Sequence, residues 1–428
     1  MTKLRTHRLV TLAPAHNRDA GSSEKLSLPA MVCIVVLFCA AAVIAAPAQG
    51  PFFTTLHVFD EADGSYPTGT LVQASDGNLY GTTFQEGAYG YGTVFKITPS
   101  GTLTTLYNFG GTDGAGPSGA LVQASDENFY GTTSVGGLGN NCGSNGCGTF
   151  FSMTPSGMLT TLYSFCPQTG CTDGGYPSGL VRATDGDFYG TTNGGGANGF
   201  GTVFKITPTG ELTTLYDFCP GGYPCADGMQ ASGVVQATDG NFYGTTNGGG
   251  AYGNGTVFKI NASGTLTSLY SFCSQPHCPD GTDPGAALVQ ASDGDFYGTT
   301  TAGGVGQGWG TVFKITAAGT LTTLHRFGVG DGADPAAALM QATDGNFYGT
   351  TYLGGAYGYA YGTVFKMTPA GTVTTLHSFN GYDGYRPVAG LAQASDGYFY
   401  GTTTLGGEYL SGTVFRVGVV HACAACRP

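Results

Sequence analysis

Cysteine pairs are the first residues in this chain whose type and spacing point to chemistry. Of twelve cysteines, Cys33 and Cys39 lie in an apolar N-terminal run. The other ten form five close pairs: Cys142 with Cys147, Cys166 with Cys171, Cys219 with Cys225, Cys273 with Cys278, and Cys423 with Cys426. Such pairs can form local disulfides in an oxidising compartment, or two pairs together can bind zinc. Three pairs occupy equivalent loops of successive repeats, which the architecture inferred below would hold far apart. We therefore predict disulfides rather than zinc.

Aspartates recur before glycine in the loops that link one repeat to the next. Three of these loops carry two acids each, namely Asp60 with Asp63, Asp280 with Asp283, and Asp331 with Asp334. Calcium is bound by six to eight oxygen atoms, several of them from carboxylates. The paired acids are therefore candidate calcium ligands. The alternative is that each aspartate shapes its own turn by bonding to nearby backbone.

Aromatic residues recur in a second set of glycine-rich loops. The candidate ligand contacts among them are Trp309, Tyr89, Tyr91, Tyr252, Tyr357, Tyr359 and Tyr409. An aromatic ring with a polar edge suits a sugar or a peptide as its ligand. The alternative is that these rings pack on neighbouring loops. Trp309, the only tryptophan, is the leading candidate.

No catalytic constellation is recognisable in the sequence. His57, His325 and His377 occupy a position that other repeats fill with tyrosine, so the position selects an aromatic ring rather than a base. Neither a nucleophile elbow, nor a zinc-protease helix, nor a phosphate-binding loop is present. We therefore predict that the protein is not an enzyme and carries no cofactor, with calcium as the exception to be tested.

These residues are positioned by a tandem repeat. Tyr-Gly-Thr-Thr occurs seven times, beginning at Tyr80, Tyr130, Tyr189, Tyr243, Tyr297, Tyr348 and Tyr400. Each copy is followed by a GTVFKIT-like phrase, and every copy except the last is then followed by a TLTTLYxF-like phrase. A period near 50 residues with several short strands is typical of a radial β array. Apolar residues on both faces of a strand, such as Val94, Phe95 and Ile97, favour blades covered on both sides.

The order of the phrases predicts how the ring closes. A TLTTL-like phrase at Phe53–Leu56 precedes the first Tyr-Gly-Thr-Thr, and the last GTVF at Gly412–Phe415 has none after it. Pairing of residues 52–59 with residues 412–417 would complete the last blade and remove two open edges. The predicted fold is thus an all-β, seven-bladed β-propeller of four-stranded blades, closed by an N-terminal strand and spanning residues 49–418. In each blade the long second-to-third and fourth-to-first loops share one face, where binding is expected.

The N-terminus reads as a signal peptide at residues 1–48. A basic, polar segment precedes the apolar run Met31–Ala46, and Ala46-Pro47-Ala48 supplies a cleavage pattern. The alternative is an uncleaved membrane anchor, although a span usually needs about 20 residues. We expect a protein that is secreted or at the cell surface or periplasm, with no membrane span after cleavage. A short tail covers residues 419–428.

Charge restricts the partners. The formal net charge is −12, with only 10% charged residues. An acidic surface repels phosphate backbones, which argues against nucleic acid as a partner. We expect a monomer that binds a carbohydrate or a protein at the cell surface.

The repeat resembles a known family at Leu71–Phe109, which reads LVQASDGNLYGTTFQEGAYGYGTVFKITPSGTLTTLYNF. This phrase is similar to the Gloeo-Verruco (GloVer) tandem repeat, and the similarity covers about residues 52–417. The resemblance implies an exported, propeller-like protein and brings no catalytic residues with it. We therefore predict a binding scaffold that acts through its long-loop face. The alternatives are a glycan lyase or hydrolase with a site at the central channel, and a purely structural envelope or matrix protein.

Overall fold

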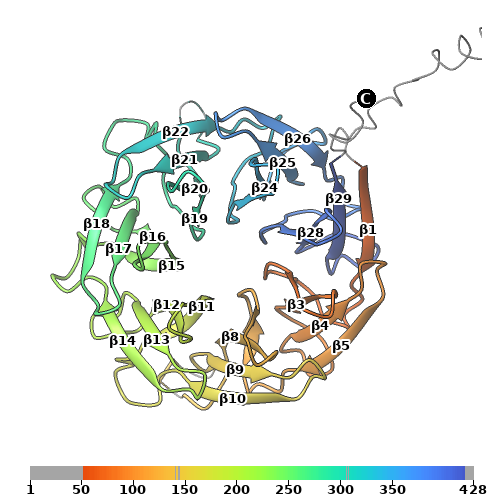
Figure 1. Cartoon of the computed structure of the whole chain (residues 1–428), viewed down its shortest axis with the longest axis horizontal. Coiled ribbons are helices and arrows are strands. Elements are labelled where there is room, and N and C mark those ends of the chain that lie inside the picture. The colour runs from red at the N-terminus through yellow and green to blue at the C-terminus, as the bar shows by residue number, and fades with distance from the viewer. Residues whose placement is uncertain (1–51, 140, 143–144, 305, 307, 420–428) are drawn as a thin grey trace, which may run out of the picture. The chain divides into compact units, whose positions relative to one another are not determined.

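Seven antiparallel sheets surround a common centre like the blades of a propeller (Figure 1). This computed structural model describes residues 52–139, 141–142, 145–304, 306 and 308–419, all within the unit Gly50–Pro428. The predicted seven-bladed, all-β fold is confirmed. The predicted signal peptide and the tail after Val419, which contains Cys423 and Cys426, lie outside the described residues.

The first four blades follow the chain in order, each running from its innermost to its outermost strand. Blade 1 contains β2 (Val72–Gln73), β3 (Leu79–Thr83), β4 (Thr93–Ile97) and β5 (Leu103–Asn108). Blade 2 contains β6 (Ala115–Pro117), β7 (Val122–Gln123), β8 (Phe129–Val135), β9 (Thr149–Met153) and β10 (Leu159–Ser164), with β6 and β7 both paired to β8. Blade 3 contains β11 (Gly175–Arg182), β12 (Phe188–Gly194), β13 (Thr202–Ile206) and β14 (Leu212–Asp217). Blade 4 contains β15 (Met229–Gln236), β16 (Phe242–Gly248), β17 (Thr256–Ile260) and β18 (Leu266–Ser271).

The last three blades repeat this plan, but blade 7 takes its outermost strand from the N-terminal side. Blade 5 contains β19 (Val289–Gln290), β20 (Phe296–Thr300), β21 (Thr311–Ile315) and β22 (Leu321–Arg326). Blade 6 contains β23 (Met340–Gln341), β24 (Phe347–Thr351), β25 (Thr363–Met367) and β26 (Val373–Ser378). Blade 7 contains β27 (Ala392–Gln393), β28 (Phe399–Thr403), β29 (Thr413–Gly418) and β1 (Phe52–Val58).

The ring closes as the sequence predicts. β1 pairs antiparallel with β29, from Phe52 opposite Gly418 to Val58 opposite Thr413 (Figure 1). Phe53 stacks on Phe415, with ring centroids 5.3 Å apart. Both strands thereby gain a partner along an edge that would otherwise be open.

The core lies between neighbouring blades rather than inside each one. One of its seven clusters joins Tyr243, Val257 and Phe272 of blade 4 to Phe296 and Phe313 of blade 5. The same kind of cluster recurs at each of the other junctions. This arrangement explains why the strands are apolar on both faces.

The glycine of Tyr-Gly-Thr-Thr is needed because a side chain there would collide with a ring of the next strand. A Cβ atom at Gly298 would lie 2.6 Å from Cζ of Phe313 and 2.7 Å from Leu288, closer than real Cβ atoms approach their neighbours. The corresponding phenylalanine lies under 3 Å from such an atom in all seven copies. This ring therefore leaves no room for a side chain at the glycine.

The tyrosine and the first threonine of the motif join neighbouring blades, and the second threonine joins two strands of its own blade. Tyr243 stacks on Phe296 of the next blade at 4.0 Å, and its hydroxyl donates to Asp239 at 2.9 Å. Thr245 donates to the carbonyl of Ala286 in the next blade at 2.8 Å. The second threonine of each copy pairs with the first threonine of the next strand through their hydroxyls. The motif is therefore a joint between blades.

Glutamine side chains add a second joint on the tight-turn side. In blade 6, Oε1 of Gln341 accepts the backbone N–H of Ser292 in blade 5 at 2.8 Å. Six junctions share this contact, through Gln73, Gln123, Gln236, Gln290, Gln341 and Gln393. At the remaining junction, Arg182 donates to Oγ of Ser125 at 3.0 Å instead. The contact of Gln73 with Ser395 crosses the closure, so the ring is joined there as at other junctions.

No helix in the described part of the chain is long and apolar enough to cross a membrane.

Candidate functional site

The long loops share one side of the ring. Because neighbouring strands are antiparallel, the tight turns of each blade lie at one end of its sheet, and the second-to-third and fourth-to-first connections lie at the other. We call this second side the long-loop face. Six of the predicted aromatic contacts are exposed in its loops: Tyr89, Tyr91, Tyr252, Tyr357, Tyr359 and Tyr409. Trp309 is only half exposed, and its ring centroid lies 5.0 Å from that of Tyr359.

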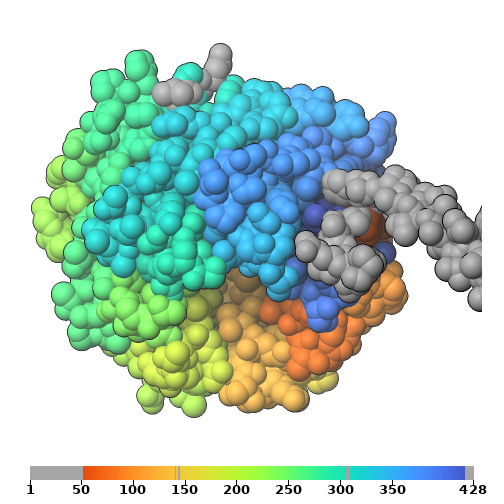
Figure 2. Space-filling model, turned by 45° about the horizontal axis from the view of Figure 1, so that its top comes forward, coloured from red at the N-terminus to blue at the C-terminus, as the bar shows by residue number. Residues whose placement is uncertain are grey.

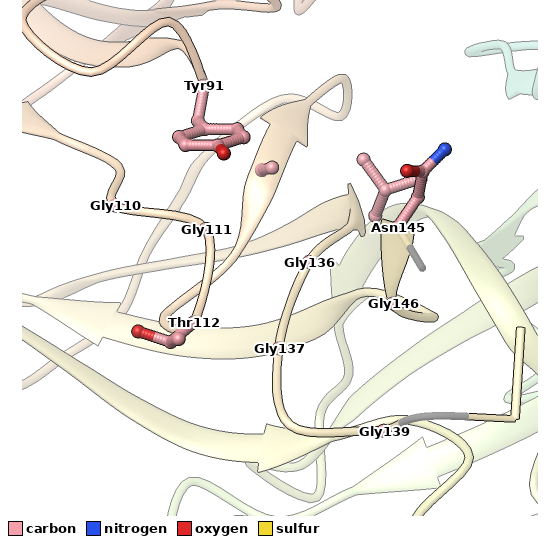
Figure 3. A pocket seen from close by; sticks show the side chains of 11 residues that line it. Tyr91, Gly110, Gly111, Thr112, Gly136, Gly137, Gly139, Asn145 and Gly146 are labelled. Carbon is pink, nitrogen blue, oxygen red and sulfur yellow. The ribbon is translucent and has the colours of Figure 1, made fainter. Parts of the chain in front are cut away.

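Two hollows occupy equivalent places at different blade junctions. The first, the glycine pocket, lies between blades 1 and 2 and has a volume of about 380 Å³. Figure 3 shows Tyr91 on one side and Asn145 on the other, with backbone from Gly110, Gly111 and Gly137 between them. Side chains contribute little to its wall. It offers backbone groups, the ring of Tyr91 and the short side chains of Thr112 and Asn145, and no charged group.

The second hollow, the tyrosine groove, lies between blades 6 and 7 and has a volume of about 990 Å³. The repeat alignment matches its residues Tyr382, Tyr385 and Arg386 to Thr112, Ala115 and Gly116 of the first junction. The groove is also lined by Tyr361, Asn380, Gly407, Glu408 and Leu410. At these aligned positions the first junction has small side chains, whereas the junction of blades 6 and 7 has two tyrosine rings and an arginine. Glu408 adds a negative charge to the same groove.

Backbone contacts fix the charged residue of the groove. The N–H of Arg386 donates to the carbonyl of Tyr361 at 2.9 Å, and the Arg386 carbonyl accepts the hydroxyl of Thr404 at 2.6 Å. The guanidinium lies over the rings of Tyr352 and Tyr385, at 5.3 and 5.8 Å from their centroids. Cation–π contacts hold such a cation without neutralising its charge. Tyr361 meets Tyr385 edge-on at 6.2 Å. The result is a preformed wall of rings beside a charged group.

Tyr382 is the most accessible ring of the groove. Its exposed fraction is 90%, the highest among the exposed large hydrophobic residues of the described chain. Its N–H donates to Oδ1 of Asn380 at 2.9 Å, which fixes the backbone that presents the ring. An exposed ring on an ordered turn can cover a ligand without unfolding any neighbouring structure.

A third hollow of about 360 Å³ lies among the inner strands of blades 3 and 4. It is lined by Ser178, Asn193, Gln230, Ser232, Asn247 and Gly285, all of them uncharged. Figure 2 shows the surface hollowed near the middle of the ring. Glycoside hydrolysis generally uses a pair of carboxylates. This pocket offers amide and hydroxyl groups to a ligand instead.

The loop aspartates are engaged in their own turns. Asp280 accepts the hydroxyl of Tyr270 at 2.8 Å and the N–H of Cys273 at 3.0 Å. Where a repeat has histidine, the contact persists, as between His325 Nε2 and Asp331 Oδ2 at 2.8 Å. The same aromatic-to-aspartate contact occurs in all seven repeats. The turn-shaping role therefore accounts for Asp63, Asp280 and Asp331.

Electrostatics agree with that structural role. Burial together with the hydrogen bond to Asp113 raises the pKa of Tyr107 to about 12. Burial alone raises the pKa of Asp334 above its ordinary value. For Asp331, burial opposes ionisation, but hydrogen bonds from His325 and Gly328 outweigh it and lower the pKa.

The predicted calcium ligands form three separate local pairs, in the connections from blade 7 to 1, 4 to 5 and 5 to 6. Asp60 and Asp63 are adjacent, with the N–H of Asp60 donating to Asp63 at 3.1 Å. Asp283 accepts the hydroxyl of its neighbour Thr282. Within the described residues, no three carboxylates converge on one point as ligands of one ion. Calcium binding at these loops stays a prediction.

Four of the five predicted disulfides are present: Cys142–Cys147, Cys166–Cys171, Cys219–Cys225 and Cys273–Cys278. The fifth prediction concerns Cys423 and Cys426. Both residues lie outside the described part of the chain, so a disulfide between Cys423 and Cys426 stays a prediction.

The expectation that pairs in equivalent loops lie far apart did not cover Cys142 with Cys147, and this pair meets Cys166 with Cys171 in space. Cys142 is in the β8–β9 loop and Cys166 follows β10, and their sulfur atoms lie 3.4 Å apart. The two loops differ in kind, but both reach the same junction between blades 2 and 3. Two pairs that the sequence assigns to different loops therefore meet in space.

Sequence reasoning missed the groove for a simple reason. Tyr382, Tyr385 and Arg386 sit in a fourth-to-first loop, whereas the predicted contacts were sought in second-to-third loops. Aligning the seven repeats carries a signal that would have found them. This loop has bulky residues at three positions where the loop between blades 1 and 2 has Thr112, Ala115 and Gly116.

Comparison with solved structures supports the fold. Virginiamycin B lyase from Staphylococcus aureus is similar with a TM-score of 0.57 and 14% identity, covering 86% of this chain and 99% of the lyase chain. The extracellular domain of a protein assigned as a hybrid two-component system from B. thetaiotaomicron is similar with a TM-score of 0.56 and 10% identity. That match covers 85% of this chain and 39% of the matched chain. At these identities the likeness is one of fold alone.

Sequence comparison identifies the family. A search of curated protein sequences finds no match. The profile of the Gloeobacter/Verrucomicrobia repeat matches residues 42–234 and again residues 222–415, which is most of the chain. The match spans the blades and the joints described above, and it confirms the resemblance seen in the repeat phrase. The chain therefore belongs to the Gloeobacter/Verrucomicrobia repeat family.

Proposed function

We propose that this protein is an exported binding scaffold that holds a carbohydrate in the tyrosine groove between blades 6 and 7. Four disulfides support export, because such bonds persist in oxidising compartments. The fold is also found in the extracellular domains of two proteins assigned as hybrid two-component systems. The repeat family and the propeller support a scaffold, while the choice of ligand rests on the groove.

The groove combines the two kinds of group that sugar recognition needs. The rings of Tyr361, Tyr382 and Tyr385 offer apolar faces to the C–H faces of a pyranose. Asn380, Arg386 and Glu408 offer donors and acceptors to its hydroxyl groups. A volume of about 990 Å³ is at the upper end of the usual range for ligand sites, which suits an oligosaccharide.

The single observation that carries the proposal is the contrast between the two equivalent hollows. Both junctions have the same framework, but only one has replaced Thr112 and Ala115 by Tyr382 and Tyr385. The stability of the ring does not need these rings, since blades 1 and 2 join without them. Their presence is explained by a ligand.

A glycan array tests the proposal, using wild type and the double variant Tyr382→Thr/Tyr385→Ala. The variant gives the groove the threonine and alanine found at the equivalent positions of the glycine pocket. Its glycan binding should weaken at least tenfold, because the two rings that stack on the sugar are removed. Tyr89→Ala is the matched control, since it removes an exposed ring of the same face outside the groove. Its glycan signal should equal that of wild type.

Several outcomes contradict the proposal. Glycan binding that survives in the double variant, or that falls equally in Tyr89→Ala, would place the ligand elsewhere. Binding of a protein array that is lost in the double variant, with no glycan bound, would favour a protein ligand. Release of shorter glycan products during incubation would favour the lyase or hydrolase alternative.

A further inference from the structure

The four cysteines at the junction of blades 2 and 3 form one cluster. The sulfur atoms of Cys142, Cys147, Cys166 and Cys171 all lie within 4.8 Å of one another. Within the described residues they are the only group of three or more His, Cys, Asp or Glu side chains whose ligand atoms converge in this way. The pairs Cys219–Cys225 and Cys273–Cys278 each supply two sulfur atoms at separate junctions.

The spacing of the cluster is that of a structural zinc site. Its sequence is Cys-x4-Cys followed after 18 residues by Cys-x4-Cys. Tetrahedral zinc binds four thiolates at about 2.3 Å, which sets neighbouring sulfur atoms about 3.8 Å apart. The sulfur of Cys142 lies 3.4 Å from that of Cys166 and 3.9 Å from that of Cys171, so Cys142 is already at the distance from the second pair that a shared ion requires.

The surroundings support a closed site. Cys147 and Cys166 are fully buried, and Cys142 and Cys171 are half-buried. A Cβ atom at Gly175 would lie 3.1 Å from the sulfur of Cys142 and 3.4 Å from that of Cys166, so the backbone passes directly over the cluster. Nδ2 of Asn141 donates to the carbonyls of Cys166 and Gln168, at 3.0 and 2.8 Å, which ties one cysteine loop to the other.

We propose that these four cysteines form a redox-dependent zinc site. In the oxidised protein they form two disulfides. Two equivalents of a dithiol reductant convert these to four thiols and two molecules of oxidised reductant. Zn²⁺ then binds four thiolates and four protons are released. Two equivalents of a low-molecular-weight disulfide reverse the change: each accepts two electrons and two protons, both protein disulfides reform, and Zn²⁺ leaves.

Metal titration of the full-length chain tests the site. The protein is reduced with a phosphine without oxygen, the reductant is removed, and Co²⁺ and then Zn²⁺ are added. We expect one ion per chain, with the charge-transfer absorbance of a tetrahedral cobalt thiolate. Cys142→Ser/Cys147→Ser should abolish this binding. Cys219→Ser/Cys225→Ser, which removes an isolated pair, should leave it unchanged.

A second measurement needs no variant and so does not depend on the folding of one. The reduced wild-type chain is alkylated with and without Zn²⁺, and each cysteine is quantified by mass spectrometry. Zinc should protect Cys142 and Cys171 and leave Cys219 and Cys273 as reactive as before. Equal protection of all pairs, the absence of any protection, or metal binding that persists in Cys142→Ser/Cys147→Ser would overturn the proposal.

Discussion

The repeated residues and the long-loop face follow opposite rules. At the joints, the same residues do the same work seven times, as in the stacking of Tyr243 on Phe296. On the long-loop face, equivalent positions carry different side chains, as with Thr112 and Tyr382. The difference teaches that repetition within this chain marks structure, whereas departure from the repeat marks candidate function. Changes at the joints should therefore cost stability, and changes on the face should cost binding only.

The strongest test removes the strand that closes the ring. Deleting residues 50–60 should lower the free energy of unfolding by about 5 kcal/mol or more, because Phe53 and Phe59 lose their burial and β29 becomes an open edge. The melting temperature should fall by many degrees. As a control, attaching residues 52–59 to the deletion variant after Gly418, through a short turn, should restore the melting temperature. A deletion that melts like wild type would contradict the closure.

Adding a single methyl group at a junction between blades should have the next largest effect on stability. Gly298→Ala places a Cβ atom 2.6 Å from the ring of Phe313, so overpacking should cost about 1–3 kcal/mol. Gly330→Ala is the matched control, because nothing lies within 4 Å of its Cβ position. Chemical denaturation of both variants measures the difference. If the two variants lose stability equally, the close packing of this glycine is not what the joint needs.

Acid should weaken the hydrogen bond between the Tyr348 hydroxyl and Asp344. Burial opposes ionisation of Asp344, but hydrogen bonds from Asn346, Lys366 and Tyr348 outweigh it and hold the pKa at about 2. Because this pKa is below its unfolded value, the ionised group adds stability above about pH 4, and the gain disappears as the pH falls through about 2. The gain is at most about 2 kcal/mol, and solvent screening reduces it. Asp344→Asn should be less stable than wild type at pH 7, and the gap should close at pH 2. An equal gap at both pH values would refute the linkage.

The glutamine joint should contribute less. Gln341→Ala removes the acceptor for the N–H of Ser292, and also a donor to the carbonyl of Gly345, at a half-buried position. The expected loss is about 1 kcal/mol, measured by denaturation. Arg182→Gln, which introduces the common residue at the one junction without it, should stay within about 0.5 kcal/mol of wild type. A larger loss there would show that the arginine contact is not an equivalent of the glutamine one.

The long-loop face should show the smallest stability effect. Tyr382→Thr truncates a ring that is 90% exposed, so the free energy of unfolding should change by under about 0.5 kcal/mol. Thermal unfolding of this single variant checks the prediction, and it complements the glycan measurement on the double variant Tyr382→Thr/Tyr385→Ala. A large loss of stability would mean that the ring belongs to the framework, and the contrast between joints and face would fail at this position.

Much of the fold could be predicted from the sequence, because each blade is defined by patterns within about 50 consecutive residues. Strand phrases, tight turns and the displaced first strand predicted seven blades and their closure. The site was less accessible because it depends on contacts between loops of neighbouring repeats. Tyr361 and Tyr382 belong to one repeat and Glu408 to the next, and no local pattern reports that they share a groove. The meeting of Cys142 with Cys166 was missed for the same reason, since it joins two kinds of loop.

The closure also sets an order of events during synthesis. β1 is the first strand of the ring to leave the ribosome, and its partner β29 is the last. Blades 1 to 6 can form from neighbouring segments as they emerge, but Phe53 must wait for almost the whole chain before it finds Phe415. A chain that terminates before β29 therefore keeps a first strand whose backbone hydrogen-bonding groups have no partner strand. Only a chain that has been translated as far as β29 can therefore complete the ring.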